Sequence, residues 1–256
     1  MGQVKSWRGI VKPAMRAPRS LATKRKAERE DLGLTPWEYA TLKRLDTPEK
    51  IQDFLTAIPA NHEVGGETIL PVREVLRQRR AHCIEGAMVA ACALWINGER
   101  PLVLDLTAVQ DFDHVITLFR RDEHWGAISK TNGIFLRYRD PIYRNLRELA
   151  LSFHHEYANR HNRKSLRSYS RPFDLRKIDP TFWVTGSDSL WELDRILSNM
   201  KHAPLVTRSQ ANRLRKRDRF ESAAGDLLQY PPPMKPRKPE QRTAAKANKA
   251  KNGKKR

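Results

Sequence analysis

The chain has 256 residues and a formal net charge of +20, from 49 Lys/Arg against 29 Asp/Glu. Residues 1–31 carry nine Lys/Arg and three Asp/Glu, and residues 201–256 carry 17 and four, so these ends hold +6 and +13 of the charge. The middle of the chain is nearly neutral. Basicity confined to the ends favours non-specific contact with anionic polymers, and no motif for specific nucleic-acid recognition accompanies it.

Two cysteines, Cys83 and Cys92, lie nine residues apart in one apolar stretch. On a single helix such a spacing does not suit a disulfide, which excludes a disulfide framework. No apolar run approaches the roughly 20 residues that cross a bilayer, and no signal-type hydrophobic region follows the basic N-terminus. We therefore expect no membrane contact and a reducing, cytoplasmic compartment.

Composition divides the chain into four parts. Residues 1–31 show no sustained apolar period, so we expect a basic, disordered segment. Residues 32–158 carry regular apolar patterns and form the predicted domain. Residues 159–204 are polar but hold several aromatic side chains, so we expect an extension that wraps the domain core. Residues 205–256 are predicted to form a second disordered basic tail.

Helix start signals open the predicted domain. Thr35-Pro36 and Thr47-Pro48 each place a capping threonine before a proline, and the apolar stripes that follow predict helices to about Leu45 and Ile58. Residues 72–78 are expected to form a short helix or turn. Later helices are predicted over 145–157 and around Trp191 to Leu197.

Residues 82–96 are apolar on nearly every side, which is typical of a helix packed all round. Strands are predicted after it, with a turn short enough for a hairpin between the second and the third. The order of helix and strands indicates an α+β fold in which a central helix packs on an antiparallel sheet. The predicted strands cover residues 101–107, 114–119, 125–129 and 135–138.

Cys83 stands at the predicted start of the buried helix, where the helix dipole favours a thiolate. His114 opens the second strand, and the fold can bring it back beside the helix end to act as a base. His82 adjoins Cys83 in sequence, but neighbouring helical residues point in different directions, so we rank His114 above it. Cys92 is expected to be a core residue.

Three segments of the chain resemble a bacterial transglutaminase-like domain, which has a papain-like core. They are His82-Cys83-Ile84-Glu85-Gly86-Ala87, Asp113-His114-Val115 and Trp125-Gly126-Ala127-Ile128-Ser129-Lys130-Thr131-Asn132. The resemblance implies a nucleophilic cysteine, a histidine on the next strand and an aspartate on the strand after it. Ser129 stands at the aspartate position, and Asn132 is the alternative residue to orient the histidine.

The resemblance implies a cysteine hydrolase or acyl transferase that forms a thioester with a peptide or amide substrate. The backbone N–H of Cys83 is expected to stabilise the oxyanion, with Gln78 and Trp125 in supporting positions. We expect no metal and no cofactor. The alternative is a non-catalytic scaffold of the same fold that binds protein or nucleic acid through its basic ends. The sequence leaves the substrate and the oligomeric state open.

Overall fold

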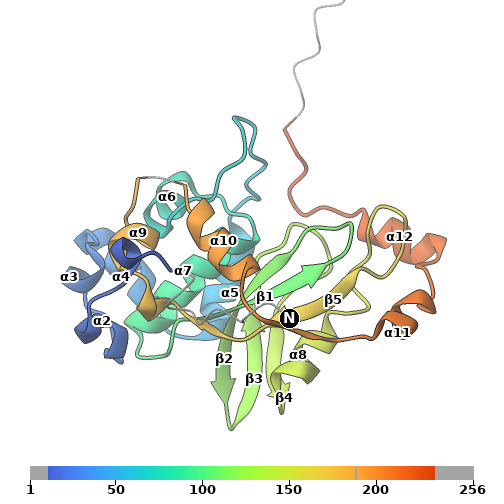
Figure 1. Cartoon of the computed structure of the whole chain (residues 1–256). Helices are drawn as coiled ribbons and strands as arrows, with labels where there is room; N and C mark the ends of the chain where they lie inside the picture. The colour runs from blue at the N-terminus through green and yellow to red at the C-terminus, as the bar shows by residue number, and fades with distance from the viewer. Residues whose placement is uncertain (1–10, 188, 234–256) are drawn as a thin grey trace, which may run out of the picture.

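Helix α7 (Cys83–Ile96) runs through the interior of the protein, with every residue from Ile84 to Ile96 buried. The computed structural model describes residues 11–187 and 189–233, and Figure 1 shows α7 between a group of helices and a sheet. The absence of a polar face in the sequence explains this position, because no side of the helix is suited to water.

All the strand pairings of the sheet are antiparallel, as the sequence predicted. The strand order is β4-β3-β2-β1-β5-β7, and the short β6 pairs with β1 beyond the end of β5. The strands are β1 (Leu102–Ala108), β2 (His114–Arg121), β3 (His124–Ile128), β4 (Arg139–Tyr143), β5 (Leu166–Ser170), β6 (Phe173–Asp174) and β7 (His202–Pro204).

Side chains alternate between the two faces of this sheet, so they belong to two separate hydrophobic clusters. On β2, Val115 and Phe119 face the cluster built around α7, whereas Ile116 and Leu118 face the cluster that includes α8 (Leu146–Ser152). The central strand β2 is therefore buried on both faces over most of its length. The sequence predicted the helix that became α8, but it did not indicate that this helix covers the second face of the sheet.

The helices around α7 begin where the capping residues predicted. Thr35 Oγ1 accepts from the Glu38 N–H at 3.3 Å, and Thr47 Oγ1 accepts from the Lys50 N–H at the same distance. The remaining helices are η1 (Pro13–Met15), α2 (Arg19–Thr23), α3 (Arg29–Leu32), α4 (Pro36–Lys43), α5 (Pro48–Ala57), α6 (Val72–Gln78), η2 (Leu175–Lys177), α9 (Pro180–Trp183), α10 (Trp191–Ser198), α11 (Arg208–Asn212) and α12 (Arg219–Gly225).

The described parts of two segments expected to be disordered, residues 11–31 and 205–233, contact the core. Within residues 1–31, Ala27 is fully buried and its N–H donates to the Trp95 carbonyl at 3.1 Å. Within residues 205–256, Tyr230 Oη donates to the Thr56 carbonyl at 2.8 Å. The prediction was wrong for these described residues, because several contacts with distant parts of the chain hold them without an apolar period. Residues 1–10 and 234–256 lie outside the described residues.

Two further outcomes concern the later part of the chain. Residues 159–204 were predicted to wrap the core, and within them Trp183 stacks on Trp95 with 6.4 Å between ring centroids. The strand predicted over residues 135–138 is wrong, because Leu136 has a left-handed backbone (φ 60°) and β4 starts only at Arg139. Within the described residues, no helix combines the length and apolar character needed to span a membrane.

Candidate active site

Cys83 is the first residue of α7 and lines a pocket of about 290 Å³ together with His114. The thiol is half-buried, whereas Cys92, two and a half turns along the same helix, is fully buried. The backbone N–H groups of a first helical turn have no partner within the helix, so the thiol lies in a positive electrostatic environment. The remaining pocket walls come from the β1–β2 loop, residues 131–136, residues 156–158 and the C-terminal segment, by which we mean residues 205–233.

His114 lies between Cys83 and Ser129. Its Nε2 is 2.7 Å from Ser129 Oγ, and it lines the same pocket as the Cys83 thiol, whose pKa it lowers. The single hydroxyl hydrogen of Ser129 is donated to the Leu136 carbonyl. Ser129 Oγ must then accept from His114, which places a hydrogen on Nε2 and leaves Nδ1 to exchange a proton with the thiol.

The electrostatic balance at Cys83 favours the thiolate. Burial raises the pKa of the Cys83 thiol, but hydrogen bonds with His114 and His82 outweigh it, and the pKa lies well below its ordinary value. Cys92 has no such partner, and burial alone raises its pKa. The pKa values of the two thiols on this helix are therefore shifted in opposite directions. Of the two, only Cys83 has the properties of a nucleophile.

His82 belongs to the site, although we had ranked it below His114. Its Nε2 is 2.8 Å from the Thr68 carbonyl oxygen and 3.4 Å from Oε1 of the fully buried Glu85. Burial lowers the pKa of His82, but its hydrogen bond with Cys83 and the charge of Glu85 raise it to about 9. His82 is the N-cap of α7 and has an extended backbone, so the argument from neighbouring helical residues does not apply to it.

Glu85 is held by three neighbours and was not singled out from the sequence. Its Oε2 accepts from the His82 N–H at 2.8 Å, its Oε1 from the Leu70 N–H at 2.8 Å, and Asn61 Nδ2 donates to both oxygens. Burial raises the pKa of Glu85 despite these bonds. A glutamate three residues after an N-cap is a helix-start pattern and is the signal that would have found it.

Ser129, and not Asn132, contacts the catalytic histidine candidate. Asn132 Nδ2 donates to the Tyr230 carbonyl at 2.8 Å, and Asn132 Oδ1 accepts from the Tyr230 N–H at 2.9 Å. Ser129 is itself fixed by Gln52, whose amide pairs with the Ser129 N–H and carbonyl, both at 2.9 Å. Gln52 comes from α5, and nothing in the sequence pattern indicated this contact.

The two supporting residues expected from the sequence lie away from the thiol. Gln78 donates to Glu74 at 2.8 Å and accepts from Arg80 Nε at 3.0 Å, so both ends of its amide are occupied. Trp125 lies at the start of β3 in the hydrophobic cluster of the opposite sheet face, 5.0 Å below the guanidinium of Arg120. We therefore leave both out of the site.

Gly86 allows the chain after β3 to pass close to α7. A Cβ at Gly86 would lie 2.4 Å from Cβ of Lys130, the residue that follows Ser129. Lys130 is buried, and its Nζ donates to the carbonyls of Leu55 (2.8 Å) and Ile58 (2.6 Å) at the end of α5. This close approach helps to keep Ser129 near His114 and the start of α7.

Comparisons with known proteins give no indication of the function. No family model matches the chain, and no similar sequence is found among curated proteins. Among the described residues, no group of three or more His, Cys, Asp or Glu side chains is arranged to hold a metal ion. The arrangement of Cys83, His114 and Ser129 can supply a thiolate, a proton donor beside it and a neutral residue that orients the imidazole.

Proposed function

We propose that the chain is a cysteine-dependent amide hydrolase or acyl transferase with a transglutaminase-like, papain-like core. One observation carries this proposal: Cys83, at the start of α7, lines one pocket with His114, and the His114 Nε2 lies 2.7 Å from Ser129 Oγ. The α+β fold and the position of Cys83 at a helix N-terminus support it. Ser129 contributes no charge, so His82, whose charged form is favoured by the buried Glu85, supplies the additional electrostatic contribution at the thiol.

The proposed reaction proceeds through a thioester. The Cys83 thiolate attacks the carbonyl carbon of an amide, and the backbone N–H groups at the start of α7 stabilise the oxyanion that forms. His114 donates the Nδ1 proton to the leaving nitrogen, so the C–N bond breaks and an amine departs. Water or a second amine then loses a proton to His114 and attacks the thioester, which releases the acyl group and restores the thiol.

The reactivity of the two cysteines tests the first requirement. Alkylation by iodoacetamide at about pH 6, below the ordinary thiol pKa of about 8.5, should modify one residue rapidly in the unaltered protein. Cys83→Ala should abolish this fast reaction, and the matched change Cys92→Ala should retain it. A protein in which neither thiol reacts faster than a free thiol at this pH would contradict the proposal.

Acylation tests the reaction itself. With p-nitrophenyl acetate as an activated acyl donor, we expect mass spectrometry to detect one acetyl group on Cys83, and His114→Ala to slow its formation by about 100-fold or more. Faster loss of the acetyl group on addition of a primary amine identifies transfer, and loss independent of amine identifies hydrolysis. A reactive Cys83 that never carries an acyl group would favour the non-catalytic scaffold.

A further inference from the structure

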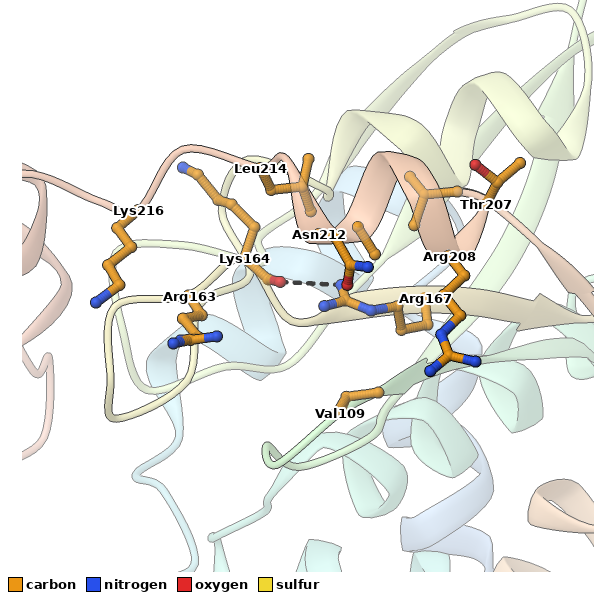
Figure 2. Close-up of a pocket in the computed structure, with 11 residues that line it drawn as sticks. Val109, Arg163, Lys164, Arg167, Thr207, Arg208, Asn212, Leu214 and Lys216 are labelled. Atoms are coloured by element: carbon orange, nitrogen blue, oxygen red, sulfur yellow. Dashed lines mark hydrogen bonds between the residues drawn. The ribbon is translucent and has the colours of Figure 1, made fainter.

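A second pocket, of about 670 Å³, lies between β5 and the C-terminal segment. Its volume is in the range of small-molecule sites. No carboxylate lines it, whereas five of its lining residues are cationic (Figure 2): Arg163, Lys164, Arg167, Arg208 and Lys216. The concentration of one sign of charge is the notable feature of this pocket.

Four of these cations lack a carboxylate partner. Among the described residues, Arg163, Arg167, Arg208 and Lys216 form no ion pair within 4.0 Å, in contrast to Arg73 with Glu38 and Arg176 with Asp174. Lys164 differs, because its Nζ donates to the His155 carbonyl and lies 3.8 Å from Glu221. Four positive charges thus line one concavity without an internal counter-charge.

Arg167 occupies a central place among these groups. In Figure 2 its guanidinium lies between those of Arg163 and Arg208, beside Asn212. Arg167 Nη1 donates to the carbonyls of Lys164 and Leu166, each at 2.9 Å, which fixes the side chain. Burial lowers the pKa of Arg167 from its ordinary value, and no carboxylate opposes this effect. A desolvated guanidinium held in this way is suited to an anion.

The two walls of the pocket are joined at both ends, so its shape does not depend on a ligand. The Leu205 N–H donates to the Arg167 carbonyl at 2.8 Å, and the Arg217 N–H donates to the Asn162 carbonyl at 2.9 Å. Arg147 from α8 also donates to the Leu205 carbonyl at 2.8 Å. The segment that carries Arg208 and Lys216 is thereby held opposite the segment that carries Arg163 and Arg167.

We propose that this pocket binds a ligand that carries several phosphate groups. Each phosphate group brings more than one negative charge and several acceptor oxygens, and the planar guanidinium matches it with two parallel hydrogen bonds. Four unpaired cations within about 670 Å³ call for a compact ligand of high charge density, which carboxylates do not provide as readily. This pocket is distinct from the Cys83 pocket. Both border the loop after β1, but Val109 lines this pocket, whereas Asp111 to Asp113 line the Cys83 pocket.

The test compares two pairs of exposed arginines in the full chain. Arg163→Gln with Arg208→Gln removes two charges from the pocket, and Arg19→Gln with Arg44→Gln removes two exposed charges near α2 and α4, at the other end of the molecule (Figure 1). Binding of tripolyphosphate and of a short single-stranded RNA is measured by calorimetry at about 0.15 M salt, where distant surface charges are screened.

We expect the pocket pair to weaken tripolyphosphate binding about tenfold or more, because two charge-assisted contacts are lost, and the control pair to change it less than about twofold. If the same difference is seen only with RNA, the pocket binds phosphate groups as proposed, and these groups belong to a nucleic-acid backbone. Equal weakening by both pairs, an unchanged affinity in the pocket pair, or no binding by the unaltered protein would overturn the proposal.

Discussion

His114 Nε2 lies 2.7 Å from Ser129 Oγ, and this bond joins the first residue of β2 to the residue that follows β3. The serine hydroxyl already donates to the Leu136 carbonyl, so it accepts from the imidazole and fixes its tautomer. A hydroxyl thereby takes the orienting position in which a carboxylate would add charge. The thiolate must then depend more on the two imidazoles beside it.

Ser129→Ala should impair the thiol without direct contact with it. The change leaves the His114 N–H without its acceptor, so the imidazole loses its fixed orientation and its stabilisation of the Cys83 thiolate weakens. We expect the pH of half-maximal Cys83 alkylation to rise and the free energy of unfolding to fall by about 1–2 kcal/mol. An unchanged alkylation profile would show that Ser129 has no part in orienting His114.

Asn132→Ala provides the contrast. Asn132 bonds only to the backbone of the C-terminal segment in the described contacts, through Tyr230 and Gln229. Loss of the two side-chain bonds should release this segment and speed its cleavage in limited proteolysis. The alkylation profile of Cys83 should stay as in the unaltered protein, and a shift similar to that of Ser129→Ala would restore Asn132 as an orienting residue.

The two histidines should contribute unequally to the thiolate. His114 lowers the pKa of Cys83 more than His82 does, and both act against the effect of burial. We therefore expect His114→Gln to raise the pH at which the thiolate forms by more than His82→Gln, as followed by ultraviolet thiolate absorbance. If His82→Gln has the larger effect, the roles of the two imidazoles are exchanged.

Gly86→Ala should destabilise the fold because its Cβ would lie 2.4 Å from Cβ of Lys130, an atom next to the backbone that cannot move freely. We expect a loss of about 1–3 kcal/mol in urea denaturation. Gly65→Ala is the matched control, since a Cβ there meets no atom within 4 Å. It should change the free energy of unfolding by less than about 0.5 kcal/mol. Equal effects at the two glycines would contradict the close approach.

His202 and Asp105 should make stability depend on pH. Their Nε2 and Oδ2 atoms are 3.0 Å apart. Burial lowers the pKa of His202, but the hydrogen bond and charge of Asp105 raise it above its ordinary value of 6.5. A histidine with a raised folded-state pKa stabilises fully below the unfolded-state pKa, and this contribution is lost as pH rises through the folded-state value. His202→Gln should therefore cost more stability at about pH 5.5 than at about pH 8.5, and an equal cost at both would contradict the pairing.

The sequence by itself determined the local elements. Periodicity and capping residues are local properties, and they placed α4, α5, α7 and the first three strands within one or two residues. They also placed Cys83 at a helix start and His114 at a strand start, because both positions follow from the boundaries of single elements.

Only the tertiary structure decided which side chains meet. The choice of Ser129 over Asn132, the contribution of His82 and the ordered contact of Tyr230 with Thr56 all depend on long-range approach of separate elements. No local pattern encodes such contacts, because each depends on where separate elements pack against one another. The basic pocket has the same origin, because its cations come from segments about 40 residues apart that meet only when β5 and the C-terminal segment are joined.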